Sequence, residues 1–191
     1  MTPDRRPPAA VRPWVLLAAM ALACSGAKHF ENPKADLSTV QRVAVMPFES
    51  MTEERLSGDK VQRLFVAELL NTRRFDVVEP ARVIRALREE KVESVAAMSP
   101  EDVQKIGRAL KVEGIFFGTV LDFVDAKGTS GAPNVTAQFK LVETGSGTTV
   151  WATTVNRSGT TMGTRLLGFS PPPLTVVASE LIRDALRTIP R

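Results

Sequence analysis

"NVTAQFKLVETGSGTTVWATTVN", residues 134–156, is the stretch that decides the fold expected for this chain. In its first part four apolar residues alternate with polar ones, and these are Val135, Ala137, Phe139 and Leu141. Such alternation is typical of a strand with one exposed face in an antiparallel sheet. The glycines of "TGSGTT" mark a tight connection, and "TTVWATTVN" has the composition of another strand. The stretch therefore predicts a β-hairpin at the end of a sheet.

Three further segments have the composition of strands. "GIFFGTVLDFVDA", which starts at Gly114, precedes the hairpin and extends it to a meander. "RVAVMPF", residues 42–48, is a continuous apolar run ended by Pro47, as expected of a strand that is buried on both faces at the centre of a sheet. "FDVVE", residues 75–79, is the remaining strand.

Helical patterns separate these strands. Apolar residues recur at helical spacing in three segments, 59–70, 83–87 and 174–189. A fourth helix is predicted by "SPEDVQKIGRALK", with Ser99 as the N-cap and Pro100 at the first helical position. The predicted order is β-α-β-α-α-β-β-β-α, which corresponds to an α/β fold with helices layered on a mixed sheet.

The first 23 residues have the composition of a secretory signal peptide. Basic residues extend to Arg12, and ten apolar residues from Trp14 to Ala23 follow. A transmembrane helix needs about 20 apolar residues, so we expect a targeting segment and no permanent helical anchor. Residues 24–41 lack apolar periodicity and are predicted to form a flexible tether, followed by a single domain over residues 42–191.

"ALAC", residues 21–24, resembles the lipobox of bacterial lipoproteins. In that family the cysteine thiol receives a diacylglyceryl group, the peptide is cut before the cysteine, and the new amino terminus is acylated, for instance with palmitate. The resemblance implies that Cys24 is lipidated, and a thiolate is the nucleophile that this chemistry requires. Ser25 replaces the aspartate that often retains lipoproteins in the inner membrane, which favours the periplasmic face of the outer membrane. An unmodified Cys24 and a twin-arginine signal at residues 5–6 are the alternatives.

Four pieces of the expected domain resemble one superfamily when taken together: "VAVMPF", "FDVVE", "KVEGIFFGTV" and "LVETGSGTTVWA". They are similar to bacterial envelope lipoproteins that include the curli secretion channel, the outer-membrane activator of penicillin-binding proteins and the amino-terminal domain of the Tol translocation protein. The resemblance covers residues 42–189 and implies the fold of that Tol domain. Its motifs specify architecture better than activity.

The sequence offers few groups for catalysis. His29 is the only histidine and lies in the expected tether, Cys24 is the only cysteine, and there is no tyrosine. No Ser/His/Asp, Cys/His or zinc-type cluster can be assembled, so we expect no enzyme, no cofactor and no metal. Asp122 and Asp125 have the chemistry for acid/base work or calcium, but solvated carboxylates at a strand end are the favoured interpretation. Residues 145–147 lack a phosphate-loop pattern and are interpreted as a turn.

Candidate partner-binding residues lie between the last strand and the last helix. In the segment 160–169 the candidates are Leu166, Leu167 and Phe169. "SPPP" contributes Pro171, Pro172 and Pro173. These prolines either offer a polyproline II surface to a partner or stiffen the approach to the last helix and define its start.

The favoured function is a lipid-anchored, non-catalytic periplasmic binding module that acts in the assembly of an envelope complex, such as cell-wall synthesis or secretion machinery. Its partners are the membrane, through Cys24, and an envelope protein or copies of itself. A formal net charge of +4 over 191 residues does not suggest nucleic acid, and no small-molecule substrate is expected. The alternative is an oligomeric curli-type secretion-channel subunit or accessory, although the connections at 128–133 and 145–147 are too short for the long hairpins of that channel.

Overall fold

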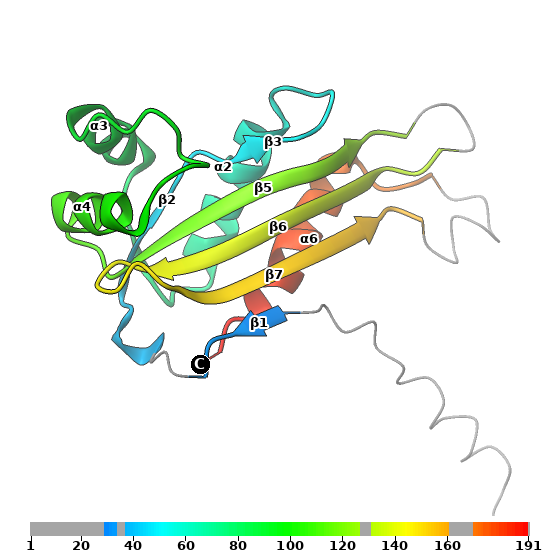
Figure 1. Ribbon diagram of the computed structural model, residues 1–191. Helices are drawn as coiled ribbons and strands as arrows, with labels where there is room; N and C mark the ends of the chain where they lie inside the picture. The colour runs from blue at the N-terminus through cyan, green and yellow to red at the C-terminus, as the bar shows by residue number, and fades with distance from the viewer. Residues whose placement is uncertain (1–28, 34–36, 127–130, 161–169, 191) are drawn as a thin grey trace, which may run out of the picture.

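A seven-stranded mixed sheet with helices on both faces forms the domain (Figure 1). The computed structural model describes residues 29–33, 37–126, 131–160 and 170–190. The strands are β1 (His29–Glu31), β2 (Arg42–Val45), β3 (Glu49–Ser50), β4 (Asp76–Val77), β5 (Gly114–Val124), β6 (Asn134–Glu143) and β7 (Thr149–Ser158). The helices are α2 (Ser57–Asn71), α3 (Pro80–Glu89), α4 (Pro100–Leu110) and α6 (Leu174–Arg187), with a 3₁₀ turn η2 at Leu37–Thr39. The predicted α/β fold is confirmed, and β1, β3 and η2 are additions to the predicted order.

The meander β5-β6-β7 makes up the antiparallel part of the sheet, as predicted. Phe139 of β6 lies opposite Gly118 of β5 on one side and Thr153 of β7 on the other. The turn between β6 and β7 needs Gly147, which has φ +70°, and a Cβ there would lie 2.8 Å from a side-chain carbon of Pro100. The interpretation of residues 145–147 as a hairpin turn is therefore confirmed.

Parallel pairing completes the sheet. The strand order is β1-β7-β6-β5-β2-β4, so β2 lies inside the sheet between β5 and β4, as its apolar run predicted. Strand β3 pairs with β5 further along, where Glu49 lies opposite Thr119. The chain therefore leaves the sheet at the end of β2 and returns to its edge before α2 begins.

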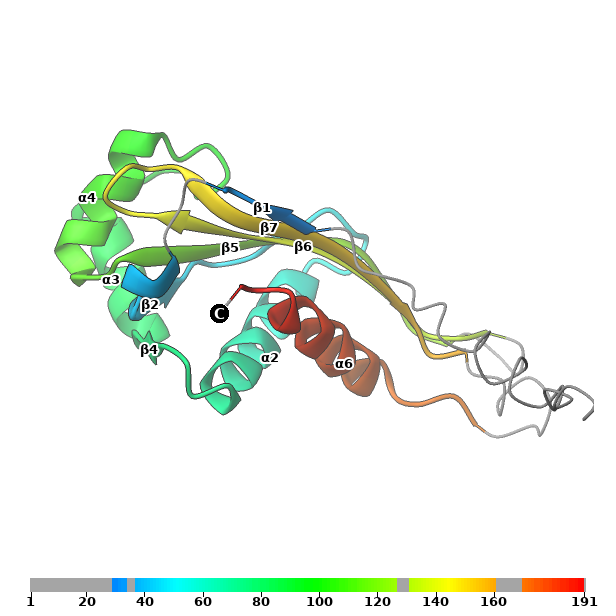
Figure 2. The same cartoon turned by 90° about the horizontal axis from the view of Figure 1, so that it is seen from below.

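Helices α2 and α6 cover one face of the sheet (Figure 2). The ring of Phe65 on α2 lies 5.3 Å from that of Phe48, 5.3 Å from that of Phe116 and 4.9 Å from that of Phe139, measured between centroids. All four rings are buried. Aromatic side chains bury large apolar areas, and ring pairs in contact add further stabilisation, so this cluster holds α2 on the sheet.

Helices α3 and α4 cover only one end of the opposite face. Their apolar side chains pack with Met46, Ile115, Phe117 and Val142. Beyond this end the same face of β5, β6 and β7 carries polar side chains such as Gln138, which is exposed. A sheet face that is open to solvent accounts for the alternation of apolar and polar residues along β6.

The predicted flexible tether over residues 24–41 is wrong in its described part. Strand β1 pairs antiparallel with β7, with His29 opposite Thr153, and the side chains of Leu37 and Val40 are buried in the core. A three-residue strand with exposed side chains has no periodicity to detect, and its backbone is stabilised by the edge of β7. The fold therefore begins before residue 42.

No helix in the described ranges is long and apolar enough to cross a membrane.

We expect Phe65→Ala to lower the free energy of unfolding by about 3–5 kcal/mol, because it removes the ring at the centre of the aromatic cluster. The matched control is Phe30→Ala, since the Phe30 side chain is 54% exposed and its loss should change stability by about 0.5 kcal/mol. Urea unfolding of the two variants gives both values. Equal losses of stability would contradict this account of the core.

A capping box starts α4. The Ser99 hydroxyl accepts a hydrogen bond from the backbone N–H of Asp102 at 3.2 Å, and the Asp102 carboxylate accepts bonds from the Ser99 hydroxyl at 3.0 Å and its N–H at 3.2 Å. These bonds to the Ser99 hydroxyl and N–H lower the pKa of Asp102 from its ordinary value of 3.8.

Ser99→Ala should lower the free energy of unfolding at neutral pH by about 1 kcal/mol, because the helix loses its N-cap. The pKa of Asp102 is lower in the folded chain, so its share of stability is present above 3.8 and is lost as the pH falls through the folded pKa. We therefore expect the difference between wild type and variant to shrink in thermal unfolding at acid pH. Ser94→Ala, at an exposed position, is the control; an unchanged difference at acid pH would contradict the role of the carboxylate.

Candidate functional site

Four residues proposed as sites from the sequence lie outside the described residues: Cys24, Leu166, Leu167 and Phe169. The lipidation of Cys24 and the partner-binding role of the other three stay predictions.

The three prolines lead directly into α6. The carbonyl of Pro173 accepts a hydrogen bond from the N–H of Val176 at 2.9 Å, which closes the first turn of the helix. Pro172 is half-buried, and its ring carbon lies 3.3 Å from the position of a Cβ on Gly159. These contacts fit the interpretation that the prolines define the helix start. Pro171 and Pro173 are exposed and so remain accessible to a partner.

Asp122 and Asp125 each accept a local hydrogen bond near the end of β5. The Asp122 carboxylate accepts a hydrogen bond from the Asn134 amide at 2.6 Å, whereas the Asp125 carboxylate accepts one from the backbone N–H of Ala126 at 2.8 Å. In the part of the chain that the structure describes, no group of three or more His, Cys, Asp or Glu side chains is placed to hold a metal ion. Each carboxylate thus forms a hydrogen bond with a neighbouring group at the end of β5.

A groove that the sequence did not predict lies beside these two carboxylates. Its volume is about 720 Å³, and it is formed by the loop after β3, the end of β5 and the start of α6. Four carboxylates and one ammonium line it, from Glu53, Glu54, Asp122, Asp125 and Lys60. We call it the acidic groove. The Lys60 ammonium lies 3.5 Å from Glu54 and 5.9 Å from the ring centroid of Phe123, so it offsets one of the four negative charges.

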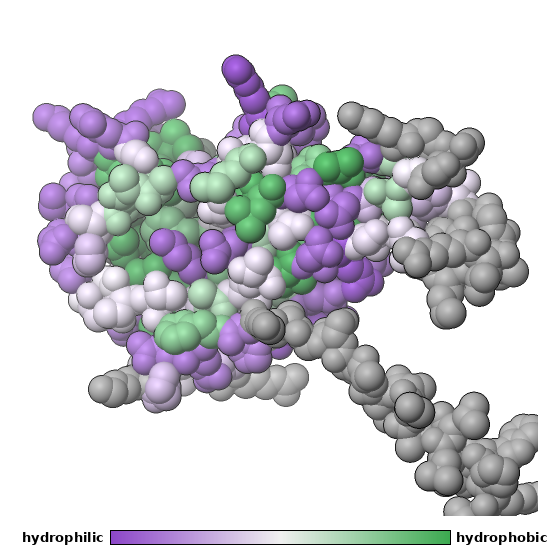
Figure 3. All heavy atoms as spheres, turned by 45° about the vertical axis from the view of Figure 1, so that its right-hand side comes forward, coloured by the Kyte–Doolittle hydropathy of each residue, from purple (hydrophilic) through white to green (hydrophobic). Residues whose placement is uncertain are grey.

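Apolar side chains are exposed around the acidic groove. Of the eight large apolar side chains that are exposed in the described ranges, five lie at this end of the domain: Met51, Leu56, Leu121, Val124 and Val176. Figure 3 shows hydrophobic side chains in separate patches, with hydrophilic side chains between them. Clusters of exposed apolar side chains bordered by charges are typical of protein contact surfaces.

A β-bulge in β5 turns Phe123 toward the core. Leu121 follows the alternation of Ile115 and Phe117, so it faces the opposite side of the sheet and is 40% exposed. The pairing of β5 with β6 then shifts between Val120 and Asp122, and this shift lets Phe123 join the core beneath the helices. A bulge re-aims side chains and bends its strand. The apolar run in "TVLDFV" carries no sign of it, because the same letters fit a regular buried strand. The groove was therefore not detectable from the sequence pattern.

A second groove, of about 420 Å³, lies at the opposite ends of α2 and α6. Three arginines and one glutamate line its rim: Arg74, Arg183, Arg187 and Glu68. We call it the basic groove. Arg183 Nε lies 3.3 Å from a Glu68 carboxylate oxygen, and its side chain remains half exposed. Its apolar lining comes from Leu69, Phe75, Leu186 and Ile189.

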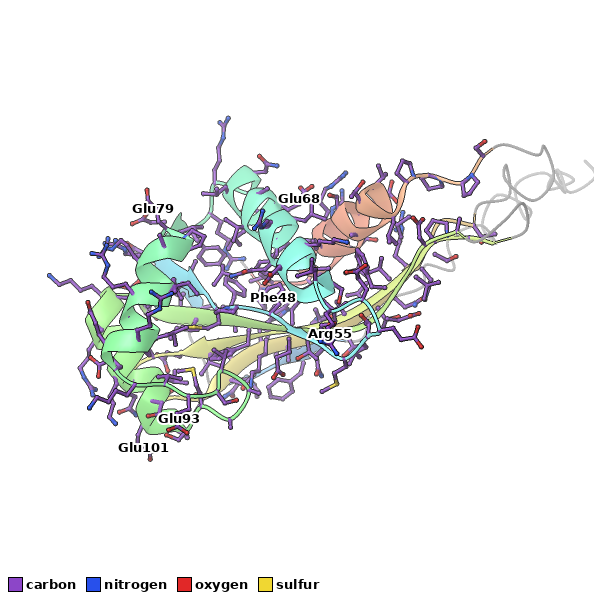
Figure 4. The ribbon with its side chains drawn as sticks, turned by 90° about the horizontal axis from the view of Figure 1, so that it is seen from above. Phe48, Arg55, Glu68, Glu79, Glu93 and Glu101 are labelled. Carbon is purple, nitrogen blue, oxygen red and sulfur yellow. The ribbon has the colours of Figure 1, made fainter. Side chains whose placement is uncertain are left out.

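The two grooves mark the two ends of the helical layer. Figure 4 shows Arg55, just before α2 begins, and Glu68, in its last turn, at opposite ends of that helix. Leu174 at the start of α6 lines the acidic groove, whereas Arg187 at its end lines the basic groove. The amino ends of both helices therefore face carboxylates and the carboxyl ends face arginines, an arrangement that complements the helix dipoles.

The chain matches no family model and no curated protein. Among solved structures it is similar to the PelC dodecamer from Paraburkholderia phytofirmans, at 22% sequence identity and a TM-score of 0.58, over 83% of this chain and 92% of that one. It is also similar to the lipoprotein GNA1162 from Neisseria meningitidis, at 16% identity and a TM-score of 0.51, over 67% of this chain and 90% of that one. At these identities the similarity shows a shared fold.

The predicted resemblance to envelope lipoproteins is supported at the level of that fold. The C-terminal domain of LpoB from Escherichia coli matches 64% of this chain, with 86% of its own length covered, at 18% identity and a TM-score of 0.47, which is too distant to add to the conclusion. The resemblance to the curli secretion channel and to the Tol amino-terminal domain stays a prediction.

Proposed function

We propose that this chain is a lipid-anchored, non-catalytic binding module on the periplasmic face of the bacterial outer membrane. Its anchor is Cys24, and its α/β domain contacts another envelope protein or copies of itself in the assembly of an envelope complex. The observation that carries the proposal is the pairing of β1 with β7 only five residues after the lipobox cysteine. The short distance along the chain keeps the domain next to its anchor.

The reach of the domain follows from this pairing. Five residues from Cys24 to His29 span at most about 17 Å when fully extended, whereas the predicted tether of 18 residues would span up to about 60 Å. A domain held this close to a membrane contacts neighbours on the same surface more readily than partners across the cell wall. The geometry thus supports a role at the membrane surface.

A binding role is also supported by the chemistry of the described residues. His29 lies on the edge strand β1 and is exposed, and the carboxylates of Asp122 and Asp125 are bonded locally. The acidic groove combines exposed apolar and charged side chains, and the basic groove has arginines at its rim over a buried apolar lining, which suits contact with a protein. No step of catalysis is needed to account for these features.

An oligomeric secretion subunit is the second candidate function. The observation that favours it is the fold shared with PelC, which is a dodecamer. At 22% identity a shared fold does not show that this chain forms the same oligomer as PelC. Self-association of this chain is therefore a proposal.

The anchor is tested by the intact mass of the chain purified from bacterial membranes. We expect a mature protein that begins at Cys24 and carries the mass of a diacylglyceryl group and a further acyl chain. Each buried methylene contributes about 0.8 kcal/mol, so two or three chains hold the protein on the membrane. Cys24→Ala should remove the added mass, and Ser25→Ala should keep it. An unmodified Cys24, or a terminus elsewhere, would contradict the proposal.

A further inference from the structure

We propose that copies of this chain associate head to tail, with the acidic groove of one copy packed against the basic groove of the next. This inference rests on the proposed function and deepens it, because it names a second copy of the chain as a partner of the anchored domain.

The charges of the two grooves are complementary. Four carboxylates and one ammonium line the acidic groove, whereas three guanidinium groups and one carboxylate line the basic groove. Opposite potentials on two surfaces favour their encounter and suppress contacts between like surfaces. Two acidic grooves would repel each other, as would two basic ones, so the charges select the contact between unlike ends.

Contacts within one copy leave much of this charge accessible. Glu53 and Asp125 form no ion pair with any described residue, and both are exposed. At the basic groove Arg183 pairs with Glu68, and Arg74 donates to the carbonyls at the end of the chain. The Arg187 side chain is 77% exposed although it lies 3.4 Å from Asp184. Arg73 lies outside the lining of the groove, is exposed just beyond α2, and adds a further positive charge at this end. Such exposed ion pairs are weak, so these side chains can exchange partners when a second copy approaches.

Complementary apolar side chains accompany the charges. Met51 is 69% exposed at the acidic groove, and Leu70 is 53% exposed in the last turn of α2. The helix dipoles within one copy explain the sign of the charges at each end, but they do not explain exposed apolar side chains. Burial between two copies would remove apolar surface from water at both ends at once.

The geometry requires two copies for this contact. Helix α2 has 15 residues and is therefore about 22 Å long, so its two ends cannot meet within one domain. A contact between two different surfaces of the same protein is heterologous, and each copy that joins offers one free end to the next. Repetition of the contact leads to a ring when the rotation closes and to an open chain when it does not.

The test is a charge swap in the full chain, purified from membranes in detergent and studied by sedimentation. One variant reverses the acidic end with Glu53→Lys and Asp125→Lys, and the other reverses the basic end with Arg73→Glu and Arg187→Glu. We expect wild type to associate, each variant alone to associate about tenfold more weakly, and an equimolar mixture of the two to recover association. Higher salt should weaken wild-type association, because these charges are exposed.

A matched control reverses two exposed carboxylates of α3 and α4 with Glu89→Lys and Glu101→Lys, and it should associate as wild type does. A monomeric wild type, variants that associate normally, or a mixture that does not recover would each overturn the proposal. The mass of the same samples reports the acylation of Cys24 separately. Failure of the anchor and failure of the head-to-tail contact are thus distinguishable.

Discussion

The packing of Phe65 against the rings of Phe48, Phe116 and Phe139 is the contact on which the rest of the structure depends. It fixes α2 on the sheet, and the position of α2 then places both grooves. Gly58 lets the first turn of α2 approach the chain after β2, since a Cβ there would lie 2.4 Å from the Phe48 carbonyl oxygen. The Ser50 and Ser57 hydroxyls, 2.7 Å apart, hold β3 against the same turn. The packing of the core therefore also determines where the two grooves lie on the surface.

Patterns that depend on local chemistry were predictable from the sequence, and features that depend on pairing were not. The alternation along β6 and the Ser99 N-cap each depend on residues that are close together in the sequence, and both predictions are confirmed. Strand β1 is three exposed residues long and exists because β7 has an edge to pair with, which no local pattern reports. The bulge at Leu121 likewise depends on the register with β6. Each groove is lined by segments that are far apart in the sequence, so the sequence does not reveal which charged residues lie together in it.

The anchor and the grooves restrict the ways in which copies of this domain can meet. The proposed lipid on Cys24 and the pairing of β1 hold every copy near one membrane surface in a similar position. A head-to-tail contact repeated about an axis normal to the membrane keeps all anchors on that surface.

Cross-linking in intact cells tests whether copies of this chain meet head to tail on the membrane. Two cysteines, introduced as Val124→Cys and Asn71→Cys, lie in the acidic and basic grooves without removing a charge, and the proposed acylation of Cys24 would leave no other thiol in the chain. After treatment with a flexible bis-maleimide, the account predicts a ladder of covalently linked copies in the membrane fraction, which disappears when either introduced cysteine is omitted. A product that stays at the mass of one chain, or a ladder that survives with only one of the two cysteines, would contradict head-to-tail association.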